Sequence, residues 1–154
     1  MHIFIALYTQ ICQSNKMAIK KPKTKYETVM LIDDSEIDNF INLKMLEGCN
    51  FSERIYVYTN GKSAIEFLKN IERMETKERS LFPNVIFLDL NMPIMDGYQF
   101  ADEFEKISSS LKSKTKIFIL TTSLNPTDIE KAKKYAQIVR YLNKPLTSEV
   151  INSL

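Results

Sequence analysis

Five short apolar runs, each followed by a segment that suits a helix, constrain the fold of this chain more than any other feature. The runs are rich in β-branched and aromatic residues, as strands are, and they cover residues 28–32, 55–58, 85–88, 116–120 and 138–142. Strands that alternate with helices through short connections predict an α/β fold. Such a fold has a parallel sheet, right-handed crossovers and helices on both faces.

The first helix is expected to begin at Ser35, because Ser35 and Asp38 resemble a capping box. Gly48 is its expected C-cap. Helical spacing predicts which apolar residues lie on its buried face. These are Ile37, Phe40, Ile41 and either Leu43 or Met45.

Residues that suit N-terminal caps mark the later helices. They are Asn60, Asn125 with Pro126 at the first helical position, and Thr147. Gly97 is expected to open the third helix by supplying unusual backbone angles, and the serines at 108–110 to end it. The residues predicted to face inward are Ala64, Ile65, Leu68 and Ile71 in the second helix and Ile129, Ala132 and Ala136 in the fourth.

Length and composition narrow the function classes. The 154 residues suit one domain, and a net charge of +2 gives no electrostatic case for a nucleic-acid partner. His2 is the single histidine, so histidine-dependent triads and imidazole metal sites are not expected. Cys12 and Cys49 are too few for a disulfide framework, and free thiols indicate a reducing cytoplasm. No apolar stretch is long enough to predict a membrane span.

Residues 1–27 differ from the predicted domain at 28–154 and contain a basic, proline-containing linker. Two interpretations remain open. Either this segment is a flexible extension, or the start was assigned too early and Met17 is the first residue.

Charged and hydroxyl side chains follow four of the predicted strands, and the carboxyl ends of parallel strands meet at one edge of a sheet. They are Asp33, Asp34, Asp89, Thr121 and Lys144. Crowded carboxylates repel unless a cation lies among them, and oxygen ligands without histidine or cysteine favour Mg²⁺ or Mn²⁺. A hard cation beside a carboxylate, a lysine and a hydroxyl suits phosphoryl transfer, with Asp89 as the nucleophile.

The motifs around these residues resemble the receiver domain of two-component response regulators. The matching segments are residues 32–34, 88–97, 120–122 and 141–145, and 88–97 reads Leu-Asp-Leu-Asn-Met-Pro-Ile-Met-Asp-Gly. The resemblance covers residues 28–154. It implies a flavodoxin-like, doubly wound (βα)5 fold with strand order 2-1-3-4-5.

The resemblance also assigns roles. Asp89 corresponds to the phosphoacceptor, and Asp34 and Asp89 to direct Mg²⁺ ligands, with Asp33 acting through water and Asn91 through its backbone carbonyl. Lys144 corresponds to the lysine that pairs with the phosphoryl group. The other implied roles are the moving hydroxyl for Thr121, the switch aromatic for Tyr141, tuning of dephosphorylation for Asn91 and Ser123, and a cis Lys144–Pro145 bond.

The expected partners are a sensor histidine kinase or a histidine phosphotransfer protein as donor, and a downstream protein as target. Because the chain ends within its last predicted helix, output by contact is expected, without DNA binding or enzymatic turnover of other substrates. Dimerisation is left open. Two alternatives remain: a phosphorylation-independent adaptor, and an aspartyl-nucleophile phosphatase of the haloacid dehalogenase type. The phosphatase needs an acid where this chain has Asn91.

Overall fold

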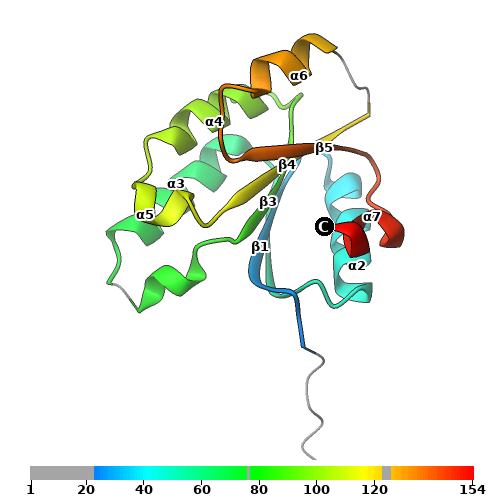
Figure 1. Cartoon of the computed structure of the whole chain (residues 1–154), viewed down its shortest axis with the longest axis horizontal. Helices are drawn as coiled ribbons and strands as arrows, with labels where there is room; N and C mark the ends of the chain where they lie inside the picture. The colour runs from blue at the N-terminus through cyan, green and yellow to red at the C-terminus, as the bar shows by residue number, and fades with distance from the viewer. Residues whose placement is uncertain (1–22, 76, 123–125) are drawn as a thin grey trace, which may run out of the picture.

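A five-stranded parallel sheet forms the centre of the computed structural model, which describes residues 23–75, 77–122 and 126–154 (Figure 1). The strands are β1 (Tyr26–Ile32), β2 (Ser52–Tyr58), β3 (Val85–Asp89), β4 (Lys116–Thr121) and β5 (Ile138–Asn143). Their order in the sheet is β2-β1-β3-β4-β5, and every neighbouring pair is parallel. The predicted fold class and strand order are confirmed.

Helices cover both faces of the sheet (Figure 1). One face carries α2 (Glu36–Gly48) and α7 (Ser148–Ser153), and the other carries α3 (Gly61–Arg73), α4 (Gly97–Glu105), α5 (Ser109–Lys112) and α6 (Pro126–Ala132). A short 3-10 helix, Glu78–Leu81, precedes β3. Successive residues of a strand point to opposite faces, so the central strands supply two separate buried clusters. Met30 and Ile86 belong to the cluster with α3 and α4, and Val29 and Phe87 to the cluster with α2 and α7.

The buried face of α2 differs from the prediction. Ile37 is 72% exposed and Phe40 60% exposed, whereas Asn39 and Asn42 are buried together with Leu46. The reason is hydrogen bonding. The Asn39 side-chain amide donates to the backbone carbonyls of Asp33 and Tyr58, at 2.7 and 3.2 Å, and the Asn42 side-chain oxygen Oδ1 accepts from the Leu146 N–H at 2.9 Å. Ile41 is also exposed, and Leu43 and Met45 are partly buried.

The structural roles of Gly48 and Gly97 differ from the predicted ones. Gly48 is the last residue of α2, and it is Asn50, with φ of 49°, that adopts the left-handed conformation after the helix. Gly97 has no positive φ. It is needed because a Cβ there would lie 2.8 Å from the Asp89 carbonyl oxygen, so α4 approaches the end of β3 more closely than a side chain permits.

The helix starts are mostly as predicted. Asn60 and Thr147 accept hydrogen bonds from the N–H groups of Ser63 and Val150, and the predicted inner face of α3 is buried. Asn125 lies outside the described residues. The predicted inner face of α6 is confirmed only at Ala132, which is buried; Ile129, within the helix, is 40% exposed. Ala136 is exposed and Tyr135 is buried instead, because the helix ends at Ala132 and the helical spacing stops there. The sequence did not predict the short helix α5. It begins at Ser109, among the serines that were expected only to end the third helix.

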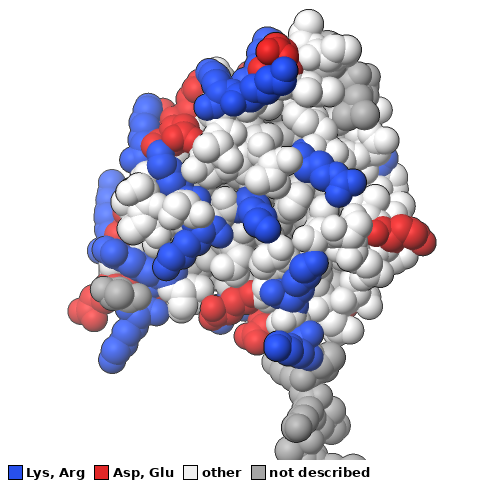
Figure 2. Space-filling view, in the orientation of Figure 1, with Lys and Arg blue, Asp and Glu red and all other residues white. Residues whose placement is uncertain are grey.

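Charge is spread over the face of the molecule seen in Figure 2, with acidic side chains between the lysines and arginines. No helix within the described residues is long and apolar enough to cross a membrane. Most of the predicted extension, residues 1–22, lies outside the described part of the chain, and β1 begins at Tyr26.

Candidate functional site

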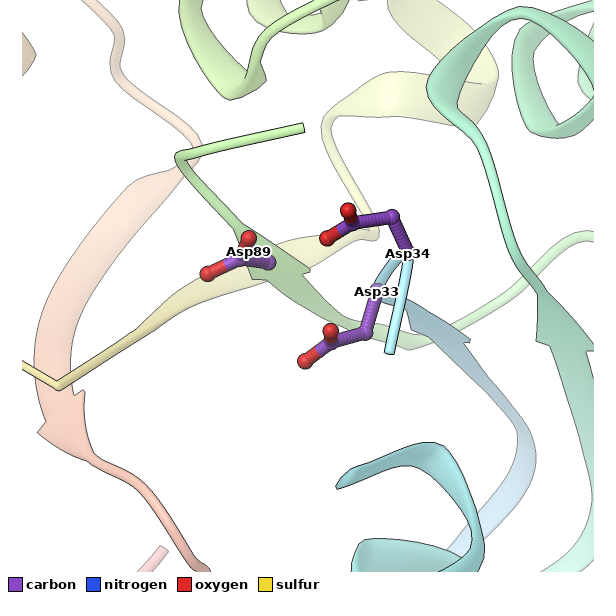
Figure 3. Close-up of side chains that lie close together, drawn as sticks. All are labelled: Asp33, Asp34 and Asp89. Atoms are coloured by element: carbon purple, nitrogen blue, oxygen red, sulfur yellow. The ribbon is translucent and has the colours of Figure 1, made fainter. Parts of the chain in front are cut away.

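Three carboxylates come together where β1 and β3 end. Asp33 and Asp34 follow β1, Asp89 ends β3, and the pairing of Ile32 with Leu88 brings these strand ends side by side. One oxygen from each carboxylate lies within 4.8 Å of the others (Figure 3). Asp33 and Asp89 are buried and Asp34 is exposed, so the cluster opens to solvent at Asp34.

Lys144 supplies the positive charge of this site. It directly follows β5, and its N–H donates to the Thr121 carbonyl at 3.0 Å, which fixes its backbone beside the end of β4. Its ammonium nitrogen lies 2.6 Å from Asp33 Oδ2, 3.0 Å from Asp89 Oδ1 and 3.3 Å from Asp38 Oδ2. The peptide bond between Lys144 and Pro145 is cis, as the family resemblance implied.

Burial and pairing act on these charges in opposite directions. Burial raises the pKa of the Asp33 carboxyl above its ordinary value, and the hydrogen bond from Lys144 only partly offsets this effect. Burial alone would lower the pKa of Lys144, but its hydrogen bonds with Asp33 and Asp89 outweigh burial and raise it. Lys144 is therefore held as a cation.

The donor set fits a hard divalent cation. Asp33, Asp34 and Asp89 offer only oxygen, and three carboxylates within 4.8 Å suit an ion such as Mg²⁺ or Mn²⁺. The Asn91 N–H donates to Asp89 Oδ2 at 3.1 Å, and this turn keeps the Asn91 backbone next to the cluster. The Asn91 side chain is exposed.

Thr121 and Tyr141 lie on the two strands beyond β3. Thr121 is buried at the end of β4, one residue after the partner of Asp89 in the sheet. The Tyr141 hydroxyl lies 2.7 Å from the Asp128 carbonyl oxygen in α6 and 3.0 Å from the Tyr98 hydroxyl in α4. Ser123 lies outside the described residues. The structure thus brings together Asp33, Asp34, Asp89 and Lys144, with Thr121 on the adjacent strand end.

Asp38 is the site residue that the sequence reasoning missed. The capping pattern predicts only a contact between Ser35 and the Asp38 backbone, and Ser35 Oγ does accept from the Asp38 N–H at 3.2 Å. The Ser35 N–H, however, donates to Asp33 Oδ1 at 3.0 Å, and the Asp38 carboxylate faces Lys144. The only signal in the sequence was an acid in the first turn of a helix that starts at the site.

The receiver class of signalling domain is defined by this combination of fold and site. The site has a carboxylate cluster, a paired lysine and a buried threonine, and it lies on the carboxyl edge of a 2-1-3-4-5 sheet. A family model described as the response regulator receiver domain matches residues 29–154. The chain belongs to this family.

Individual relatives agree with this membership. A two-component response regulator from Cytophaga hutchinsonii is 30% identical with a TM-score of 0.74, covering 85% of this chain and 94% of that one. The Mn(2+)-bound form of response regulator Rcp1, of Synechocystis sp., is 26% identical with a TM-score of 0.64, covering 82% and 88%. The Helicobacter pylori sensor histidine kinase CheAY is 27% identical and covers 99% of this chain, which spans 17% of that kinase.

Proposed function

We propose that this protein is a response regulator that accepts a phosphoryl group on Asp89 from a histidine of a partner protein. The observation that carries the proposal is the Lys144 ammonium, 3.0 Å from Asp89 Oδ1 and 2.6 Å from Asp33 Oδ2, where both carboxylates cluster with that of Asp34. A nucleophilic carboxylate, a fixed cation and an oxygen cluster for a metal ion are the groups that phosphoryl transfer requires.

In the transfer, an Asp89 oxygen attacks phosphorus while the bond from phosphorus to the donor nitrogen breaks. The nitrogen keeps the electron pair and takes up a proton, and Asp89 becomes an acyl phosphate. Lys144 is placed to neutralise charge on the transferring oxygens. Asp33, Asp34, Asp89 and the Asn91 carbonyl would hold Mg²⁺ (or Mn²⁺), which supplies further charge neutralisation when bound.

The signal would leave the site through Thr121 and Tyr141. The Thr121 hydroxyl turns toward the phosphoryl group, and Tyr141 moves after it, giving up its contacts with the Asp128 carbonyl and the Tyr98 hydroxyl. These movements shift the population of two states of the surface formed by α6, β5 and α7, and a downstream protein binds one of them. Asn91 and Ser123 would set the lifetime of the phosphate.

The phosphoryl donor would be a sensor histidine kinase or a histidine phosphotransfer protein, encountered in the cytoplasm. A relative of this chain is itself named a sensor histidine kinase, which supports a connection with kinases in general. The chain would catalyse only its own phosphorylation and dephosphorylation.

Intact mass spectrometry tests the proposal directly. The protein is incubated with acetyl phosphate, with and without Mg²⁺, beside an Asp89→Asn variant. We expect one phosphoryl adduct that requires Mg²⁺ and is missing from the variant. Wild-type protein that stays unmodified, although it binds Mg²⁺, would contradict the proposal and favour a phosphorylation-independent adaptor.

A further inference from the structure

A fourth carboxylate reaches the site from the first turn of α2. Asp38 Oδ2 lies 3.3 Å from the Lys144 ammonium, and the Asp38 side chain is 35% exposed, against 9% for Lys144. The hydrogen bond from the Asp38 N–H to Ser35 Oγ fixes the backbone of this residue. Asp38 thus contacts the cation of the site from its solvent side, while Asp33 and Asp89 contact it from within.

We propose that Asp38 is a positioning residue that restrains Lys144 and lowers the affinity of the site for a phosphoryl group. The inference rests on the proposed function, because Lys144 must turn from its carboxylate partners toward the incoming phosphoryl oxygens. Three carboxylates share one ammonium here, at 2.6, 3.0 and 3.3 Å. Asp38 is the one of the three that lies outside the cluster able to hold a metal ion.

The charge of Asp38 has opposite consequences for the two ligands of the site. A carboxylate near Asp33, Asp34 and Asp89 attracts a divalent cation and repels the anionic phosphoryl group. It also competes with the phosphoryl oxygens for Lys144. Asp38 therefore favours the metal ion and disfavours the phosphoryl group.

The proposed effect on Lys144 must be distinguished from a simpler role of Asp38 in stabilising α2. An acid in the first turn of a helix stabilises that helix through the positive N-terminal end of its dipole. Glu36 is the matched control, because it lies in the same first turn of α2, is exposed, and has no ion pair among those of the described residues. Glu36→Gln and Asp38→Asn each remove one negative charge from that turn, but only Asp38→Asn removes a partner of Lys144.

Calorimetric titration of wild type, Asp38→Asn and Glu36→Gln tests the inference. Each protein is titrated with Mg²⁺, and then with beryllium fluoride, a phosphoryl mimic, in saturating Mg²⁺. In Asp38→Asn we expect Mg²⁺ to bind about twofold to fivefold more weakly and beryllium fluoride to bind tighter by a similar factor, the range for a partly exposed ion pair. Glu36→Gln should behave like wild type.

Opposite shifts distinguish a charge effect from damage to the fold, because a distorted site would bind both ligands more weakly. Weaker binding of both ligands by Asp38→Asn, or values equal to those of Glu36→Gln, would overturn the inference while leaving the proposed function intact. Wild-type protein that binds no beryllium fluoride in Mg²⁺ would overturn the proposed function and this inference with it.

Discussion

Replacing Gly97 with alanine should destabilise the protein, although the backbone angles at this position suit alanine. Gly97 begins α4 and has no positive φ, so the usual expectation is that alanine stabilises the fold by about 0.4–1 kcal/mol. The close approach of α4 to the end of β3 opposes that gain. An added Cβ would lie 2.8 Å from the Asp89 carbonyl oxygen, 2.9 Å from Leu90 Cδ2 and 3.0 Å from Leu90 Cα.

Two of these three contacts are with backbone atoms, which cannot move aside without shifting the strand end. Overpacking of this kind costs about 1–3 kcal/mol. Taking the middle of each range, a cost of about 2 kcal/mol less a gain of about 0.7 kcal/mol leaves a net loss of about 1.3 kcal/mol in the free energy of unfolding.

Urea denaturation followed by far-ultraviolet circular dichroism measures this loss. Gly48→Ala is the control, because beyond its chain neighbours and the backbone of α2 itself no heavy atom lies within 4 Å of a Cβ added there. That variant should be more stable than wild type by about 0.5–1 kcal/mol. A Gly97→Ala protein as stable as wild type, or as stable as Gly48→Ala, would refute the argument from close packing.

Three further predictions concern the surroundings of the site and the surface. Ile94 is 88% exposed and has a φ of 69°, a backbone conformation that asparagine tolerates better than isoleucine. Ile94→Asn should therefore raise the free energy of unfolding, measured by urea denaturation, by about 0.5–1 kcal/mol. An unchanged or lower value would contradict this prediction. Asn39→Ala should lower the unfolding free energy by about 1–3 kcal/mol, because the Asp33 carbonyl loses a buried donor and the Tyr58 carbonyl a partly buried one. A loss near zero would mean that these contacts contribute nothing. Glu103 pairs with Lys106 and Lys69, whose hydrogen bonds lower its pKa to about 2. Because the pKa of Glu103 is lower in the folded than in the unfolded protein, its ion pairs stabilise the fold above about pH 4.5, and this stabilisation is lost toward pH 2. Glu103→Gln should therefore be less stable than wild type near pH 6, and the difference should vanish near pH 2. Thermal unfolding of both proteins across this range measures the difference, and a constant difference would contradict the role of these ion pairs.

The sheet and the centre of the site were predictable because both follow from local pattern and topology. Residues 85–88 are a continuous apolar run that ends at Asp89, and a parallel arrangement puts the end of that run beside Asp33 and Asp34. Lys144 follows β5 in the same way. None of these placements depends on how individual side chains pack.

The errors arose where a distant backbone or side chain decides the outcome. Helical spacing placed Ile37 and Phe40 inside, but the hydrogen bonds of Asn39 with two strand ends and of Asn42 with Leu146 turn the other face of α2 inward. The Leu146 partner is 104 residues away in the sequence. Such pairings leave no periodic signal.

The roles of Asp38 and Gly97 were missed for the same reason. The partner of Asp38, Lys144, is 106 residues away, and a capping motif gave a sufficient local account of Asp38. For Gly97, a turn gave a sufficient local account, while the actual constraint is the distance to the Asp89 carbonyl. A residue with an adequate local role can therefore hide a second role that only the fold reveals.

The proposed function requires that Asp89 itself carries the phosphoryl group. The most direct measurement is to treat the phosphorylated protein with borohydride, which reduces an acyl phosphate to an alcohol, and to sequence the peptides by tandem mass spectrometry. We expect homoserine at position 89, dependent on Mg²⁺ and on the phosphodonor. Aspartate unchanged at position 89, with phosphate or a reduction product found at another residue, would contradict it.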